Sequence, residues 1–174
     1  MRLVLFLCMT TGALGTQSLA QEQNESQVKA AFVFQFVKFV EWPPEAFNDN
    51  NSPIVVGLVG EDPTSNAIDH TINGKIANGR RLQIKRFTTF RAITRCHILF
   101  LSSSQSDNLT RILAAVGPAV LTVGETERFA HIGGIINFII VDSKIRFEIN
   151  PGTAEKARLR ISAKLLSLAR VIRN

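Results

Sequence analysis

Three short, largely apolar runs constrain the fold of this chain more than any other feature. They cover residues 54–59, 97–101 and 119–123, and the first is β-branched and ends at Gly60. Such runs are typical of strands buried on both faces, as in a parallel sheet that helices cover on each side. Segments with helical spacing alternate with these strands, so the sequence predicts an α/β fold.

The first helix is the clearest of the surrounding elements. Apolar residues three and four apart predict an amphipathic helix over residues 25–40, and Trp42-Pro43-Pro44 ends it, because proline cannot continue a helix. Further elements are predicted from the same patterns: helices over residues 63–72 and 107–116, and a half-exposed strand over residues 81–87.

The last third of the chain predicts a different arrangement. Residues 135–141 and 144–149 flank Asp142-Ser143 and predict an antiparallel hairpin. Asn150-Pro151 predicts the start of a final helix that carries Leu159, Leu165 and Leu166 inward. The expected fold is therefore a single α/β domain. Its central sheet is mostly parallel or mixed and has about six strands, with helices on both faces and a C-terminal hairpin plus helix.

The first twenty residues have the order of a cleavable signal peptide. Arg2 precedes an apolar stretch, Ser18 and Ala20 are small, and a polar run follows. The apolar stretch is shorter than the roughly 20 residues that a membrane span needs. The sequence thus predicts a signal peptide over residues 1–20, cleaved after Ala20, and a periplasmic domain over residues 21–174.

The charge is basic overall and unevenly distributed. The formal net charge is +6, with eight acids between residues 20 and 69 and seven bases but no acid between residues 70 and 106. This pattern indicates a polarised surface or two halves that neutralise each other on folding. The basic stretch lacks the interleaved aromatics of a single-strand binder, so nucleic acid is not an expected partner. An acidic protein surface or an anionic small molecule fits better.

The motifs that could carry catalysis or bind a cofactor all have a simpler structural interpretation. Gly133-Gly134 precedes a strand rather than a helix, which favours a turn or bulge over a phosphate loop. Neighbours on a strand point to opposite faces, so Cys96 and His97 do not predict a nucleophile–base pair. The three histidines share no metal-ligand spacing. We therefore expect a protein that is not an enzyme and holds neither metal nor cofactor.

Four residues are the candidates for contact with a partner or a ligand. Asn137 stands in an apolar strand, where a buried amide needs partners. Arg146 alternates with Ile145 and Phe147 and so faces away from them. Arg128 would join these two residues if the strand ends form a pocket. Trp42, at the corner after the Phe-rich first helix, is the candidate on a protein contact surface, although core packing is the commoner role for such a ring.

Several blocks of the chain together resemble the YfiR family of periplasmic proteins. In sequence order they are Lys29-Ala30-Ala31-Phe32, Phe36-Val37-Lys38-Phe39-Val40-Glu41-Trp42-Pro43, Val59-Gly60-Glu61-Asp62-Pro63, Cys96-His97-Ile98-Leu99-Phe100, Leu121-Thr122-Val123, Phe129-Ala130-His131-Ile132-Gly133-Gly134-Ile135-Ile136-Asn137-Phe138, Arg146-Phe147-Glu148-Ile149-Asn150 and Ile161-Ser162-Ala163-Lys164-Leu165-Leu166.

The resemblance implies an α/β fold with a mixed sheet and a role in signalling. The founding family member binds the periplasmic sensor domain of an inner-membrane diguanylate cyclase and represses it, and release raises cyclic di-GMP and favours biofilm growth. Relatives often carry a cysteine that matches Gly57 and pairs with the one matching Cys96. Here Gly57 cannot form that disulfide, so redox control through it is not expected.

Two hypotheses of different classes follow. The first is a non-enzymatic periplasmic regulator whose partner is a membrane sensor protein such as a diguanylate cyclase, with an outer-membrane lipoprotein and a homodimer left open as further partners. The second is a periplasmic small-molecule-binding module with a pocket lined by Arg128, Asn137 and Arg146. A pocket that brings these residues together favours the second.

Overall fold

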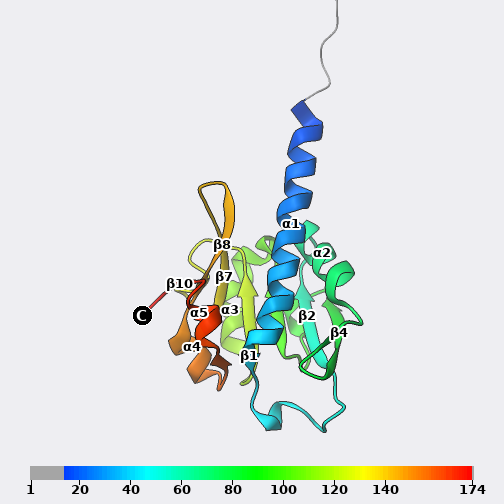
Figure 1. Cartoon of the computed structure of the whole chain (residues 1–174), viewed down its shortest axis with the longest axis vertical. Helices are drawn as coiled ribbons and strands as arrows, with labels where there is room; N and C mark the ends of the chain where they lie inside the picture. The colour runs from blue at the N-terminus through cyan, green and yellow to red at the C-terminus, as the bar shows by residue number, and fades with distance from the viewer. Residues whose placement is uncertain (1–13, 174) are drawn as a thin grey trace, which may run out of the picture.

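An eight-stranded mixed sheet forms the centre of the protein in the computed structural model, which describes residues 14–173 (Figure 1). The strand order is β10-β8-β7-β6-β5-β2-β4-β3. The strands are β2 (Ile54–Val59), β3 (Ile76–Ala77), β4 (Arg80–Phe87), β5 (Ile98–Leu101), β6 (Leu121–Gly124), β7 (Ile136–Val141), β8 (Lys144–Ile149) and β10 (Arg170–Val171). The α/β fold with a mixed central sheet is confirmed, and two-residue edge strands account for the excess over the six strands expected.

Strands β4, β2, β5, β6 and β7 run parallel, and β7–β8 is an antiparallel hairpin. The parallel strands are joined by helices α2 (Pro63–Ile72) and α3 (Leu109–Ala115) and by the short 3-10 helices η2 (Phe90–Ala92) and η3 (Ser103–Asn108). Asp62 caps α2 by accepting a hydrogen bond from the Ser65 N–H at 2.6 Å, as its position before Pro63 favours.

The two faces of the sheet bury two separate cores. Alternate residues such as Val56, Leu58 and Phe100 point toward α1 (Leu14–Phe39) and α2, whereas Val59, Leu99 and Leu101 point toward α3. Figure 1 shows α1 and α2 side by side in front of the sheet. This alternation is the period-two side-chain pattern of a strand, and it explains why the central strands are apolar at nearly every position.

Helix α1 is longer than the predicted segment. It begins at Leu14 and crosses the predicted cleavage bond after Ala20, and its first turns extend beyond the rest of the molecule (Figure 1). Residues 1–13 of the predicted signal peptide lie outside the described residues. No helix in the described part of the chain is both long and apolar enough to span a membrane.

The predicted single C-terminal helix was wrong. Helix α4 (Pro151–Lys156) ends where Arg158 takes a positive φ of 59° and the Leu159 N–H donates to the Ala154 carbonyl, a helix-ending arrangement. Ile161 then pairs with Val40 in the two-stranded sheet of β1 (Val40–Glu41) and β9 (Arg160–Ile161), before α5 (Ala163–Leu166) and β10. Pairing with β1 and β8 satisfies backbone groups that a continued helix would have bonded internally.

Candidate functional site

The carboxyl end of β6 opens a pocket, because β7 continues after β6 has stopped. The two strands pair only through Val123–Ile136 and Gly124–Asn137, and the chain then turns away through residues 125–134. A pocket of about 480 Å³ lies between that turn and β7. We call it the polar pocket, and its lining comprises Lys29, Glu125, Thr126, Glu127, Arg128, His131, Asn137, Phe138, Ile139, Ile140, Glu148 and Arg170.

A nearly buried ion pair closes one side of the polar pocket. The Lys29 Nζ lies 2.6 Å from Glu125 Oε2, and the two side chains are 15% and 9% exposed. Thr64 also donates a hydrogen bond to this carboxylate oxygen at 3.2 Å. Burial, and then the neighbouring Asp62 carboxyl group, raise the pKa of Glu125, while Lys29 opposes the rise.

Asn137 and Glu148 form the floor of the polar pocket from paired positions on β7 and β8. The Asn137 amide nitrogen donates to Glu148 Oε2 at 3.4 Å, and Arg170 Nη1 lies 3.5 Å from Glu148 Oε1. Asn137 is only 2% exposed, yet its Oδ1 accepts no hydrogen bond from any residue that the structure describes. A buried acceptor without a donor costs about 1–3 kcal/mol, so a ligand N–H or O–H at this point would be stabilised.

The structure brings together two of the four candidate residues. Arg128 and Asn137 line the polar pocket, and Arg128 has a left-handed φ of 61° in the turn before β7. Arg146 is on the same face of β8 as Glu148 but outside the pocket lining, exposed on the β7–β8 hairpin. Trp42 lies at the opposite end of the sheet, where its indole N–H donates to the His97 carbonyl at 3.1 Å.

The Cys96-His97 pair has a structural arrangement. His97 Nδ1 accepts from the Val55 N–H at 3.0 Å, so the proton is on Nε2, which donates to the Ala46 carbonyl at 3.1 Å. The ring also stacks on Phe47 at 4.6 Å. Burial lowers the pKa of His97 and raises that of the Cys96 thiol to about 12. Both ring nitrogens are occupied and the thiol stays protonated, so these two groups do not form a nucleophile and base.

Sequence reasoning missed the charged half of the polar pocket. Glu125 and Lys29 are 96 positions apart, so only the packing of α1 over the end of β6 brings them together. The sequence could have indicated Glu148 as a site residue, because it alternates with Phe147 and Ile149 and so lies on the face of the strand opposite to these apolar side chains. No group of three or more potential metal-ligating side chains occurs among residues 14–173.

The glycines before β7 fit the predicted turn. Gly133 has a positive φ of 108°, and a side chain at Gly134 would collide with the ring of Phe129. The two residues thus let the chain fold closely over Phe129 before it enters the sheet.

These features define an α/β domain with ligand-sized pockets and a mixed sheet covered on both faces. Residues 26–170 match the YfiR/HmsC-like family, and the chain belongs to that family. The family is periplasmic and regulatory rather than catalytic, and it takes part in diguanylate cyclase signalling. No curated protein matches the chain.

A solved structure shares the fold. It is a conserved domain protein from Vibrio cholerae O1 biovar El Tor, with a TM-score of 0.55 and 10% sequence identity. The similarity covers 85% of this chain and 60% of that protein, so this chain spans less than two thirds of the length of that protein.

Proposed function

We propose that this protein is a non-enzymatic periplasmic regulator that binds the sensor domain of an inner-membrane diguanylate cyclase and holds the enzyme inactive. Membership of the YfiR/HmsC-like family supports the signalling role. Export through the predicted signal peptide would place the domain beside such a sensor. Loss of the contact would then raise cyclic di-GMP.

The β7–β8 hairpin is the surface that supports a protein contact most directly. Its tip extends past β6 on one side and past β10 on the other. Within residues 14–173, the segment 140–145 therefore pairs only with itself in the hairpin. Ile140 is 61% exposed and Val141 is 42% exposed. Free strand edges and exposed apolar side chains are what a partner strand or a partner surface recognises. Figure 1 shows the hairpin standing clear of the sheet.

The charges of the hairpin indicate the chemistry of the partner. Lys144 and Arg146 are exposed on β8, close to the apolar tip. The nearest acid on the hairpin is Asp142 in the turn. A partner surface that combines an apolar patch with acidic side chains therefore fits, since opposite charges favour encounter and orientation.

The test of this surface replaces Ile140 with aspartate. Ile140→Asp should no longer retain the cyclase in a membrane pull-down, and cyclic di-GMP in the native host should rise to the level of the deletion strain. Ile76→Asp is the matched control, because Ile76 is 65% exposed at the opposite edge of the sheet on β3. Unchanged cyclic di-GMP on deletion of the gene would overturn the regulatory function, and normal retention of Ile140→Asp would overturn the hairpin as its surface.

One observation favours the second function, a small-molecule-binding module. The unpartnered Oδ1 of Asn137 lies in a pocket that Arg128 also lines. These are two of the three residues in the ligand hypothesis; Arg146 lies outside this pocket. A thermal-shift screen of amino acids and nucleotides tests it, because a ligand that binds only the folded state raises the melting temperature. The shift should disappear in Arg128→Gln, and a screen without any shift would contradict this function.

A further inference from the structure

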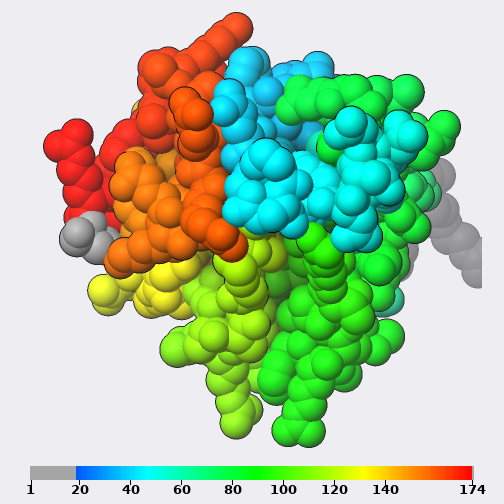
Figure 2. Space-filling view, turned by 90° about the horizontal axis from the view of Figure 1, so that it is seen from below, coloured from blue at the N-terminus to red at the C-terminus, as the bar shows by residue number. Residues whose placement is uncertain are grey.

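A second and larger pocket lies at the other end of the parallel strands, where β5 and β6 begin. Its volume is about 770 Å³. In the view of Figure 2, a hollow separates the green surface of the chain around η2 from the yellow-green surface at the end of α3. We call it the apolar pocket, and its walls include Phe90, Ile93, Leu99, Ile112, Val116 and Val120.

The walls of the apolar pocket are hydrophobic because two connections diverge there. The loop through η2 leaves β4 and returns to β5, and α3 ends at Ala115, after which Val116 is extended. Leu99 and Ile112, at the back of the pocket, belong to the core between the sheet and α3. The pocket thus continues a buried apolar surface outward to solvent, and a ligand with an apolar body would remove more of that surface from water.

The mouth of the apolar pocket is positively charged. Arg91, Arg95 and Arg158 line it with a single carboxylate, that of Glu45. Arg158 forms an ion pair with Glu45 at 3.0 Å. Arg95 is fixed by donating to Asn48 Oδ1 at 2.9 Å and to the carbonyls of Glu45 and Ala46 at 3.0 and 2.9 Å. These acceptors are neutral, so no described carboxylate compensates its charge. Arg91 forms no ion pair with any described residue; its guanidinium lies 5.7 Å from the centroid of the Phe90 ring.

From these walls and charges we propose that the apolar pocket binds an amphipathic organic anion, a carboxylate with an aliphatic tail. The carboxylate pairs with Arg91 and Arg95 at the mouth, and the tail lies against Phe90, Ile112 and Val116. Arg91 suits this role because its planar guanidinium can donate to both carboxylate oxygens, and Arg95 adds positive charge beside it. The site is distinct from the β7–β8 hairpin and does not depend on the proposed repressor function.

Isothermal titration of the purified protein with decanoate, octanoate and decylammonium below their micelle concentrations tests the ligand class. Decanoate should bind saturably and more tightly than octanoate, since each buried methylene lowers Kd roughly fourfold. Decylammonium has the same tail and the opposite charge, so it should bind at least about tenfold more weakly than decanoate. Equal binding of the two ions, or no binding of decanoate, would overturn the proposal.

Two adjacent alanines of α3 test the location. Ala115 is exposed and lines the apolar pocket, whereas Ala114 is exposed and does not. Ala115→Trp should fill the mouth and lower decanoate affinity more than tenfold, and Ala114→Trp should bind as the original chain does. Both variants should keep the unliganded melting temperature, because neither alanine is in the core. Unchanged binding by Ala115→Trp would contradict this location.

A charge variant provides a check that does not depend on the tryptophan variants folding. Arg91→Gln should weaken decanoate several-fold but leave the neutral decanol unaffected, since only the anion uses the guanidinium. An equal effect on decanoate and decanol, or no effect on either, would show that Arg91 does not bind the carboxylate.

Discussion

Cys96 and His97 are neighbours in the sequence but have different structural roles. The imidazole of His97 holds the loop around Ala46 against β2, and the thiol of Cys96 belongs to the core on the α3 face. A Cβ placed on Gly57 would lie 3.4 Å from the Cys96 sulfur. Gly57 therefore occupies the position at which a cysteine, as in the resembling family members, would lie close enough to bond with Cys96.

Restoring that cysteine should restore a disulfide. We expect Gly57→Cys to bond with Cys96 on oxidation, because the new Cβ would lie within bonding reach of the Cys96 sulfur, at 3.4 Å. The same Cβ would lie 2.6 Å from Phe87 Cε2, so this ring must move. The stabilisation should be about 2–4 kcal/mol less the cost of moving the ring. Thiol titration and unfolding with and without reductant measure both quantities. Gly57→Ala has the same Cβ but no disulfide, so it measures the cost of moving the Phe87 ring alone. If both thiols of Gly57→Cys stay free on oxidation, the predicted disulfide is wrong.

The burial of His97 predicts acid sensitivity. Burial, opposed by the hydrogen bond to Ala46, lowers its pKa in the folded state below the ordinary 6.5. Between those two values the unfolded chain binds a proton that the folded chain does not, so stability is lost as the pH falls below 6.5. Chemical denaturation at pH 7.5, 6.5 and 5 should show this loss.

A pair of histidine variants separates this effect from other titrations. His97→Gln should be less stable at pH 7.5, and its free energy of unfolding should depend less on pH. His70→Gln, at an exposed position of α2, is the surface control for replacing an imidazole. The raised pKa of Glu125 has the opposite effect, because it makes stability fall as the pH rises. It is present in the original chain and in both variants. A His97→Gln slope equal to that of the original chain would contradict the assignment.

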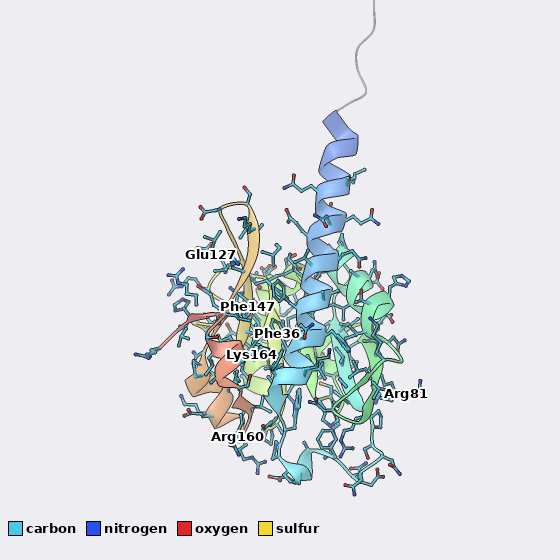
Figure 3. All side chains as sticks on the ribbon, in the orientation of Figure 1. Phe36, Arg81, Glu127, Phe147, Arg160 and Lys164 are labelled. Carbon is cyan, nitrogen blue, oxygen red and sulfur yellow. The ribbon has the colours of Figure 1, made fainter. Side chains whose placement is uncertain are left out.

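At the scale of elements, an aromatic cluster attaches α1 to the β7–β8 hairpin. Phe36 lies 5.7 Å from Phe138 and 5.1 Å from Phe147 between ring centroids, and Phe32 also contacts both. Figure 3 shows Phe36 on α1 close to Phe147. The rings that the sequence placed on an amphipathic helix are thus mainly core, and they fix the base of the proposed contact surface.

Removing one ring should test how strongly α1 is held. Phe36 is fully buried, so Phe36→Ala should lower the free energy of unfolding by about 3–5 kcal/mol through lost burial and a cavity. Gln35→Ala, at an exposed position of the same helix, should change it by less than about 0.5 kcal/mol. Urea denaturation followed by circular dichroism measures both, and similar values for the two variants would contradict the packing.

At the scale of the molecule, the two oppositely charged halves of the sequence partly neutralise each other. Arg86 pairs with Asp69 at 3.0 Å, and Arg80 and Arg95 donate to backbone carbonyls between Glu45 and Ser52. The basic stretch therefore helps to hold the acidic half against the sheet. Six bases of this stretch form no ion pair with a described residue. Two of them, Arg91 and Arg95, line the apolar pocket.

The amino-acid sequence by itself determined the central strands, the amphipathic face of the first helix, the position of α2 and the hairpin. Each depends on a local period of apolar residues or on a proline, asparagine or aspartate at a turn, which act over a few neighbouring positions. After Asn150 the local pattern predicted the wrong structure. The segment with helical spacing forms short helices and strands instead, because Val40 and Ile149 provide partners for backbone pairing.

Only the tertiary structure decided the pockets. Arg128 and Asn137 were visible in the sequence, but the Lys29–Glu125 ion pair joins positions 96 apart, and the apolar pocket forms between two loops that diverge. The physical reason is that a strand or helix is specified by contacts within a few residues. A pocket is instead specified by where separate elements end relative to one another, and only the packed sheet and helices fix that.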